Sequence, residues 1–248
     1  MYQFFVEPDQ INVNDKSVII TGPDINHIKN VLRMRVGEEI SVSNGQDGCE
    51  YRCGIIGFTE ESVLCELRFV KEDGVELPVK VTLYQGLPKG DKMELIIQKA
   101  VELGVYEIVP VASRRCVVKL DERKAEAKVA RWQSIAEAAA KQSKRAIVPQ
   151  IRPVTSFAQA AAEAAEKDVR LIPYELESGM NRTRALMSAI KPGQRVAVFI
   201  GPEGGFEESE ISMAQEKGIC PITLGRRILR TETAGMTILA WISYLLEQ

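Results

Sequence analysis

The sequence is poor in the residues that metal sites and many catalytic sites require. It has one histidine, His27, and five cysteines, no two of which are spaced as a Cys-x-x-Cys pair. A structural zinc site takes four such ligands, so the sequence predicts no metal. A Ser-His or Cys-His catalytic pair would have only His27 as its base. Cysteines without paired spacing favour a reducing compartment, and we expect a cytoplasmic protein.

The chain also lacks long apolar runs and a marked net charge. No run of about 18 apolar residues occurs, so no membrane span is expected, and the N-terminal residues do not resemble a secretory signal. The 32 Lys and Arg residues against 34 Asp and Glu residues give a net charge of −2. This balance argues against a protein that coats nucleic acid by bulk charge. The 248 residues suffice for one large domain or two smaller ones.

The charge is unevenly distributed along the chain. Residues 1–78 contain 7 basic and 14 acidic side chains, whereas residues 79–248 contain 25 basic and 20 acidic ones. A shift of this size favours two domains. The polar segment 71–78 ends in a proline and is the expected linker. We therefore predict one domain over residues 1–72 and a second over residues 73–248.

The first of these segments has short, partly alternating apolar runs, with strand-like stretches at residues 4–6, 17–20, 40–58 and 62–70. Asn44-Gly45 and Asp47-Gly48 interrupt the third stretch, which is typical of a β-hairpin. One short helix is expected over about residues 24–34. The pattern predicts a small, mostly antiparallel β domain that is compatible with a barrel.

From residue 79 onward, apolar strands alternate with helices. Strands are expected at residues 79–86, 106–113, 169–174, 195–200 and 219–224, and helices at 91–104, 121–142, 158–165, after Glu207, and at 233–246. Asp91 and Glu94 have the spacing of a capping box at the start of the first helix. Such alternation predicts a mostly parallel sheet with helices on both faces.

Unusual residues follow three of these strands, and in open α/β sheets ligands bind beyond the carboxyl ends of the strands. Glu175 follows the strand at 169–174, and the Gly-Pro-Glu-Gly-Gly-Phe loop at 201–206 follows the strand at 195–200. Its glycines would let the backbone approach a flat ligand closely, although a tight turn into a helix would also use them. The loop matches neither a dinucleotide fingerprint nor a phosphate loop. Acidic Glu207 and Glu208 disfavour a phosphate there, so a neutral or cationic adenosine ligand fits better than a nucleotide.

The second unusual segment, LGRRILRTETA at residues 224–234, contains three arginines and one glutamate between a buried strand and an apolar helix. Such charges are costly there unless they are paired or functional. The alternative is that Thr231 or Thr233 caps the last helix while the arginines are solvated.

The loops VFIGPEGGF and LGRRILRTETA resemble the cofactor-binding loops of the SPOUT methyltransferases, whose C-terminal chain forms a trefoil knot. Three further segments are HIKNVLRMRVGEEI, KVTLYQGLPKGDKMELIIQKAVELGV, and RWQSIAEAAAKQSKR followed by VPQI. In this order they resemble the ribosomal small-subunit RNA methyltransferase family that modifies uridine at N3. The resemblance covers nearly the whole chain.

The resemblance implies a PUA-like β-barrel that holds RNA, followed by a knotted α/β SPOUT methyltransferase domain. It also implies S-adenosylmethionine as methyl donor, 16S rRNA or the small ribosomal subunit as substrate, and a homodimer. Carried over by position, the cofactor-binding residues are Pro173, Glu175, Ile200, Gly201, Pro202, Glu203, Gly204, Gly205, Leu224, Gly225, Ile228, Leu229, Arg230, Thr233 and Ala234. Two positions depart from the family pattern: Gln3 stands in place of an arginine, and Lys141 in place of a glutamate before Gln142.

Methylation of uridine at N3 requires loss of the N3 proton and support of negative charge on O2 and O4. We expect Arg230 to support that anion, with Glu232 either orienting Arg230 or accepting the proton through water. Two other functions remain open. One is a ribose 2′-O-methyltransferase of the same fold, and the other is a non-catalytic RNA-binding or ribosome assembly protein.

Candidate RNA contacts come from two basic regions. Arg33 and Arg35 lie on the otherwise acidic first domain. Residues 113–145 hold 10 basic and 4 acidic side chains, and we expect phosphate contacts from this segment at Arg114, Gln142, Lys144 and Arg145. A charged helix is also commonly just a solvated face. For His27 we expect a structural or RNA-packing role.

Overall fold

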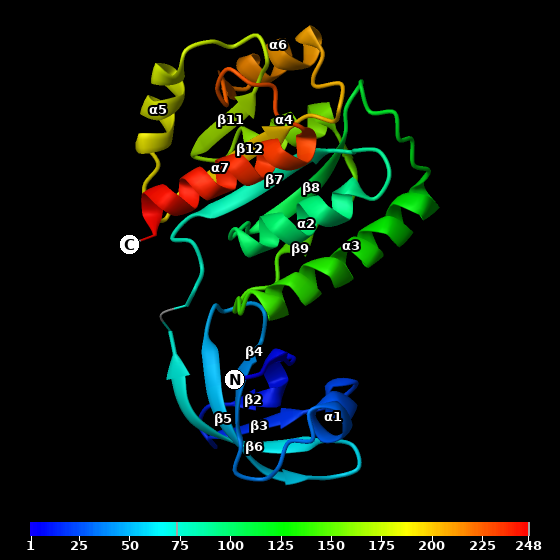
Figure 1. Cartoon of the computed structure of the whole chain (residues 1–248), viewed down its shortest axis with the longest axis vertical. Coiled ribbons are helices and arrows are strands. Elements are labelled where there is room, and N and C mark those ends of the chain that lie inside the picture. The colour runs from blue at the N-terminus through cyan, green and yellow to red at the C-terminus, as the bar shows by residue number, and fades with distance from the viewer. Residues whose placement is uncertain (73, 248) are drawn as a thin grey trace. The chain divides into compact units, whose positions relative to one another are not determined.

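The computed structural model describes residues 1–72 and 74–247, which form two compact units (Figure 1). The first unit contains Met1–Glu76 and Ala140–Val148, and the second contains Leu77–Ala139 and Pro149–Gln248. The chain thus leaves the first unit at Glu76 and returns to it with residues 140–148. No sequence pattern indicated this return.

The first unit is built on a six-stranded sheet in the order β1-β4-β5-β6-β3-β2. Its strands are β1 (Gln3–Phe5), β2 (Ile11–Asn12), β3 (Ser17–Ile20), β4 (Glu39–Ser43), β5 (Glu50–Phe58) and β6 (Val63–Lys71). β1 is parallel to β4, and the other neighbours are antiparallel. Alternate residues of β6, Val63, Cys65 and Leu67, are buried in one apolar cluster. This two-residue period is what the sequence pattern predicted.

The helix expected over residues 24–34 is short and irregular. After the 3₁₀ turn η1 (Pro8–Gln10), one turn of α-helix, α1 (Asp24–Asn26), continues into a π-helical turn, η2 (His27–Val31). Arg33 follows with a φ of 54°. Ile28 is buried, and the partly buried Ile25 and Leu32 pack beside it on the same apolar cluster, so these three side chains anchor the segment to the core.

The returning segment is fixed to the first unit by a buried ion pair. Arg145 is 3% exposed, and its Nε donates to the two carboxylate oxygens of Glu76 at 3.3 and 3.1 Å. Glu76 also accepts the backbone N–H groups of Ala146 and Ile147 at 3.2 Å each. One carboxylate at the end of the linker therefore holds three consecutive residues of the return.

Lys144 ends the helix that precedes this segment. Its N–H donates to the carbonyl of Lys141 at 3.3 Å, and the N–H of Arg145 donates to that of Ala140 at 3.0 Å. These two bonds define a Schellman motif, in which the residue at the Lys144 position takes the left-handed conformation that glycine prefers. Lys144 has a φ of 60°.

The second unit contains a parallel sheet in the order β10-β8-β7-β12-β11-β13, with β9 paired to β8. Its strands are β7 (Lys80–Gly86), β8 (Glu107–Ala112), β9 (Gln150–Ile151), β10 (Thr155–Ser156), β11 (Val169–Pro173), β12 (Arg195–Ile200) and β13 (Cys220–Ile222). All five predicted strands are confirmed, and β12 has the predicted bounds.

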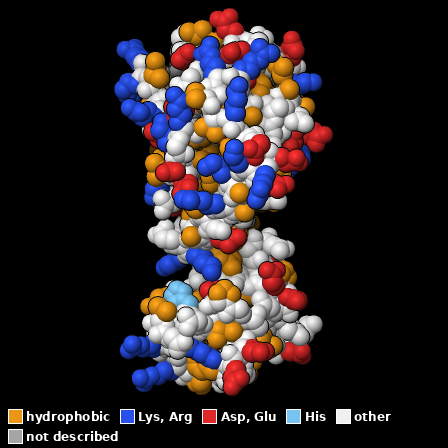
Figure 2. Space-filling model, turned by 90° about the vertical axis from the view of Figure 1, so that its right-hand side faces the viewer, with side chains coloured by type: hydrophobic (Ala, Val, Ile, Leu, Met, Phe, Trp, Pro, Cys, Tyr) orange, Lys and Arg blue, Asp and Glu red, His pale blue; other side chains and the backbone are white. Residues whose placement is uncertain are grey.

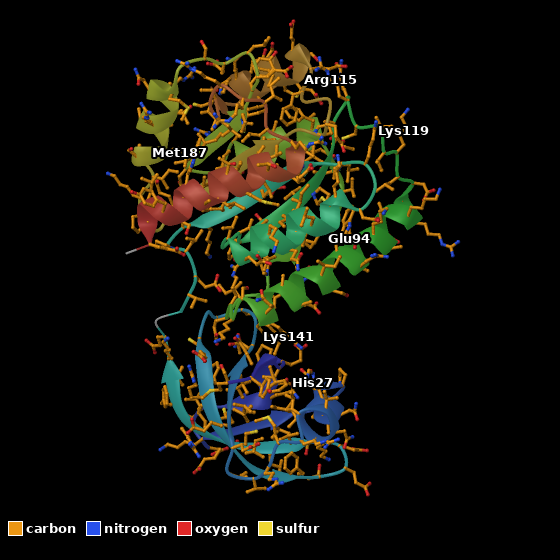
Figure 3. All side chains as sticks on the ribbon, viewed as in Figure 1. His27, Glu94, Arg115, Lys119, Lys141 and Met187 are labelled. Atoms are coloured by element: carbon orange, nitrogen blue, oxygen red, sulfur yellow. The ribbon has the colours of Figure 1, made fainter. Side chains whose placement is uncertain are left out.

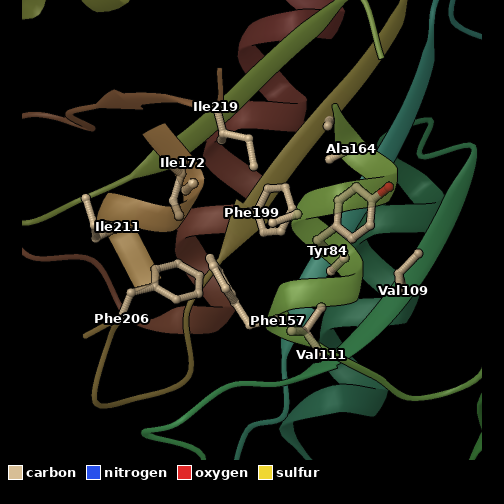
Figure 4. Packing of buried hydrophobic residues seen from close by; sticks show 14 residues of the cluster. Tyr84, Val109, Val111, Phe157, Ala164, Ile172, Phe199, Phe206, Ile211 and Ile219 are labelled. Carbon is tan, nitrogen blue, oxygen red and sulfur yellow. The ribbon is translucent and has the colours of Figure 1, made fainter. Parts of the chain in front are cut away.

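Helices cover both faces of this sheet: α2 (Lys92–Glu102), α3 (Glu122–Gln142), α4 (Phe157–Ala164), α5 (Met180–Ser188), α6 (Glu208–Glu216) and α7 (Thr231–Leu246). α7 packs on β12 and against α2 and α5, while α4 packs against α6. An aromatic cluster lies in the core near α4 and α6 (Figure 4). In it Tyr84 stacks on Phe199 at 4.5 Å between ring centroids, and Phe157 and Phe206 complete the cluster. The sequence did not indicate α5, β9 or β10.

The capping box predicted at the start of α2 is wrong. Asp91 makes no side-chain cap bond, although the helix forms and buries Met93, Ile96, Ile97, Ala100 and Val101. The carboxylate of Glu94 is instead drawn to α3, where it binds the Nε of Arg131 at 2.8 Å (Figure 3). A tertiary ion pair has thus replaced the local bond that the spacing suggested.

Replacing Glu76 with Gln should lower the free energy of unfolding by about 3 kcal/mol, because it removes the carboxylate charge that pairs with the buried guanidinium of Arg145. Urea denaturation measures this change. Lys124→Ala is the matched control, because Lys124 pairs with Asp121 at the surface, and it should change stability by less than about 1 kcal/mol. Equal effects of the two variants would contradict a structural role for the Glu76–Arg145 pair.

Candidate active site

A cavity of about 340 Å³ lies at the carboxyl ends of β11, β12 and β13. Three segments form its walls, one from each strand end, and Lys92 of α2 completes it. The lining residues are Lys92, Pro173, Tyr174, Glu175, Ile200, Gly201, Pro202, Glu203, Gly205, Phe206, Thr223, Leu224, Gly225, Arg226, Arg227, Ile228, Leu229, Arg230, Thr231 and Ala234. The structure thus brings together the three strand ends that the sequence singled out.

Thirteen of the fifteen predicted cofactor residues line this cavity, and Gly204 and Thr233 do not. A Cβ at Gly204 would lie 3.2 Å from the Cβ of Arg115, and the Gly204 carbonyl accepts a hydrogen bond from Arg115 at 2.8 Å. Thr233 is exposed on α7. Gly204 therefore serves the packing of the loop against Arg115, which corrects its predicted place in the pocket wall.

Two glycines give the cavity its open backbone walls. Gly205 has a φ of +67° and Gly225 a φ of +112°, and a Cβ at either position would meet no atom within 4 Å. Positive φ explains why glycine stands at both positions. The empty space beside them leaves the backbone accessible to a ligand.

The loop after β12 is held in place by charged groups from two other strand ends. Glu203 accepts the N–H of Lys89 at 3.1 Å and the Nζ of Lys92 at 2.7 Å. Arg114 donates its N–H to Glu210 at 2.9 Å, and its guanidinium lies 3.3 Å from Glu207. Glu207, one of the two acidic residues that disfavour a phosphate here, therefore also joins the loop to the end of β8.

The carboxylate of Glu203 is also electrostatically tuned. Burial raises its pKa, but the bonds from Lys92 and from the backbone N–H groups of Glu203 and Lys89 outweigh that effect, so the pKa of Glu203 is lowered. Lys92 was not among the predicted site residues. Its only sequence signal was its place in the first turn of a helix that follows a strand end.

The start of α7 forms the opposite wall of the cavity. Its N-cap is Arg230, without a side-chain cap bond, so the expectation that Thr231 or Thr233 caps this helix is wrong. The hydroxyl of Thr231 instead donates to the carbonyl of Gly201 at 2.6 Å. This bond joins the segments after β12 and β13, which are thirty residues apart in sequence.

Arg230 and Glu232 are not paired with each other. Arg230 is exposed at the rim of the cavity and forms no ion pair among the described residues. Glu232 is half-buried, and its Oε2 is enclosed without a hydrogen-bond partner in the described part of the chain. The rim also carries Arg226 and Arg227, which sequence analysis noted without assigning them to the site.

Of the predicted RNA contacts, Arg33, Arg35, Gln142 and Lys144 are exposed on the first unit. Arg145 is a correction, because its buried pair with Glu76 removes it from the surface. Arg114 is exposed but is partly engaged by Glu207. Figure 2 shows basic side chains and His27 at the surface of one face.

The two departures from the family pattern have local partners in the first unit. Gln3 donates to the carbonyl of Arg145 at 2.8 Å, and Lys141 lies 3.3 Å from Asp24. His27 is exposed, and its ring meets Phe4 edge-on at 6.2 Å between centroids. Figure 3 labels Lys141 and His27.

Comparison with known families matches both units. A model described as an RNA methyltransferase domain matches residues 75–243, and one described as an RNA methyltransferase PUA domain matches residues 20–68. Fold and site together are those of an RNA methyltransferase.

None of the helices in the described ranges is long and apolar enough to cross a membrane.

Named relatives define the family more closely. The ribosomal RNA small subunit methyltransferase E of Bacillus subtilis is 38% identical over 100% of this chain and 98% of its own length. The enzyme of the same name from Synechocystis is 32% identical over 99% of this chain and 78% of its own. The chain belongs to the ribosomal RNA small subunit methyltransferase E family.

Solved structures agree with this assignment. The Neisseria gonorrhoeae member, bound to S-adenosylmethionine, has a TM-score of 0.84 at 31% identity, covering 99% of this chain and 98% of that one. A Legionella pneumophila methyltransferase with the same bound cofactor has a TM-score of 0.81 at 32% identity, covering 98% and 96%. These likenesses confirm the predicted PUA-like domain followed by a SPOUT methyltransferase domain with a parallel sheet.

Removing the charge of Lys92 should raise the pKa of Glu203 toward its ordinary value. In Lys92→Met the carboxylate keeps only the backbone N–H donors, and a carbon-detected NMR titration would report the shift. As pH falls through the pKa of Glu203, the Lys89 amide loses its acceptor and should exchange faster with solvent. A Glu203 titration that does not move in Lys92→Met would contradict this account of the loop.

Proposed function

We propose that the protein transfers a methyl group from S-adenosylmethionine to N3 of a specific uridine in the 16S rRNA of the small ribosomal subunit. The observation that carries this proposal is the cavity formed by three strand-end segments with three arginines at its rim, in a chain of this family. Because such a substrate is cytoplasmic, we propose the same location for the protein.

The residues present fit the proposed cofactor. The cavity volume lies within the range of small-molecule sites, and Ile200, Leu224, Leu229 and Ala234 supply apolar walls. Gly205 and Gly225 leave backbone open to the ligand. When bound, S-adenosylmethionine supplies an electrophilic methyl group on a sulfonium.

The chain's own contribution to the reaction is positioning and charge. Arg230 stands at the rim without a counter-ion among the residues that the structure describes, so its guanidinium can support negative charge on O2 or O4 of the uridine. Two residues along, Glu232 has a carboxylate oxygen with no hydrogen-bond partner in the same described part of the chain. We propose that it orients Arg230 in the substrate complex or accepts the N3 proton through water.

Backbone conformation supports RNA contacts at two positions of the first unit. Arg33 and Lys144 are two of the three non-glycine residues with positive φ in the described chain. A left-handed residue with a side chain costs about 1 kcal/mol. Two basic side chains kept at that cost on an exposed surface are best explained by binding a polyanion. We propose that both contact rRNA phosphates, together with Arg35 and Gln142.

We also propose a homodimer. Three large apolar side chains are exposed on α2 and α7, which pack against each other: Leu95 (43%), Tyr244 (85%) and Leu245 (44%). An apolar surface of this kind favours association with a second copy.

The test of the proposed function is nucleoside analysis of small-subunit RNA after incubation with the protein and labelled S-adenosylmethionine. We expect 3-methyluridine. Label in a 2′-O-methylribose would replace the proposal with the ribose methyltransferase. An absence of both label and cofactor binding by calorimetry would leave a non-catalytic RNA-binding protein.

Arg230→Lys should reduce kcat about 100- to 1000-fold, because lysine cannot reproduce the planar fork of donors toward a developing anion. Cofactor affinity and melting temperature should stay nearly unchanged. Glu232→Gln should be less damaging if Glu232 only orients Arg230, and comparably damaging if it takes the proton. Near-wild-type turnover of Arg230→Lys would remove Arg230 from the mechanism.

The double variant Arg33→Gly, Lys144→Gly should weaken RNA binding and flatten its salt dependence by roughly 0.7–0.9 units of log K against log salt per lost phosphate contact. Glycine suits both backbones, so the fold should be retained or stabilised. Filter binding at several salt concentrations measures the slope. Lys124→Ala, on the exposed side of α3, is the control. An unchanged slope in the double variant would leave Arg33 and Lys144 as solvated residues.

A further inference from the structure

A buried polar side chain lies behind the cavity without lining it. Gln85, near the end of β7, is 0% exposed. Its Nε2 donates to the hydroxyl of Thr231 at 2.9 Å and to the carbonyl of Gly86 at 3.0 Å, while its Oε1 is buried without a partner among the described residues. A polar group kept in a buried position with half of its bonding unsatisfied calls for an explanation beyond packing.

The hydrogen-bond directions in this network are determined. The single hydroxyl proton of Thr231 is donated to the carbonyl of Gly201 at 2.6 Å. Thr231 must therefore accept from Gln85, and the Nε2 of Gln85 must face it. If the amide were turned over, its Oε1 would face the Thr231 oxygen and the Gly86 carbonyl oxygen, and neither of these contacts would contain a donor. The lone Oε1 is thus the consequence of directing two donors toward the site.

We infer that Gln85 is a positioning residue that fixes the two walls of the cavity to each other, an inference that rests on the proposed function. Through Thr231 it connects the start of α7, which carries Arg230, to Gly201 at the start of the loop after β12. The same strand end touches that loop directly, because a Cβ at Gly86 would lie 2.7 Å from Pro202. β7 therefore serves as the fixed support against which both walls are aligned.

Gln85→Glu tests this role by changing one atom. A carboxylate would present an acceptor to the Thr231 hydroxyl and to the Gly86 carbonyl, so the bridge should break. We expect the Kd for S-adenosylmethionine to rise about 10- to 100-fold at pH 8, the usual consequence of opposing buried polar groups. Gln85→Met, which keeps the shape and has no donors, should show a similar loss at every pH.

The Gln85→Glu deficit should shrink as pH falls. Burial raises the pKa of a carboxyl, and the protonated form has an O–H that can replace the lost donor. The ionisable side chains at the ends of the strands around Gln85 and at the start of α7 are Lys89, Asp91 and Lys92 after β7, Arg114 and Arg115 after β8, Glu203 and Glu207 after β12, and Arg230 and Glu232. Two pairs of these neutralise each other, Lys92 with Glu203 and Arg114 with Glu207. Wild type measured at pH 6 and pH 8 corrects for titration of these groups.

Thr231 supplies a second test that does not depend on the Gln85 variants. Thr231→Ser keeps the hydroxyl and should bind S-adenosylmethionine nearly as wild type does, whereas Thr231→Val should lose affinity. Thr231→Val also removes the bond to Gly201. Combined with Gln85→Met, it should still lose less than the sum of the two single losses, because both changes break the Gln85–Thr231 bond. Gln215→Glu on the exposed surface of α6 is the matched control and should bind normally at both pH values.

The outcomes separate this inference from the proposed function. Affinities are measured by calorimetry at a temperature where circular dichroism shows each variant folded. Additive losses of the two changes, or folded Gln85 variants with wild-type affinity, would overturn the positioning role. A wild-type protein that neither binds S-adenosylmethionine nor methylates RNA would overturn the proposed function itself.

Discussion

The site depends on one constraint of parallel sheets, namely that consecutive strands deliver their following loops to the same edge. β11, β12 and β13 each end in a segment without regular structure, and the three segments meet only because their strands run in one direction. The cavity is therefore a property of the sheet. Small residues are needed where two strand ends pass close to one another, as Gly86 at the end of β7 does beside Pro202 of the loop after β12.

Apolar contact anchors the end of the loop after β12 at the buried ring of Phe206, and a further force holds the exposed residues of this loop. Here charges from the ends of β7 and β8 provide it: Lys92 binds Glu203, and Arg115 binds the Gly204 carbonyl. The loop after β12 is thus held from both sides by basic residues, while its open glycine backbone faces the cavity. Arg226, Arg227 and Arg230 after β13 form no ion pair with any residue that the structure describes, and they are exposed to a substrate.

Sequence reasoning succeeded where periodicity decides the structure and failed where a tertiary partner does. Both ends of β12 were predicted correctly, because its largely apolar run lies between the turn residues Pro192-Gly193 and Gly201-Pro202. The site was found because strand ends are where ligands bind, and because two loops resembled a known family. By contrast, Gly204 could not be distinguished from Gly205, since only the position of Arg115 shows which glycine faces the cavity. Gln85 gave no signal, because a glutamine in a strand has no pattern of its own.

The basic segment 113–145 shows how counting charges along a chain overstates the binding surface. Its net positive charge is divided between two units, and within each unit acidic residues consume part of it. Arg145 is held by Glu76 and Arg114 by Glu207, whereas Lys144 is exposed at a helix end and forms no ion pair within residues 1–72 and 74–247. Charges that already have partners in the fold would have to break those bonds to bind phosphate. The surface that can bind RNA is therefore set by the basic residues left unpaired, and backbone strain at Lys144 marks one of them.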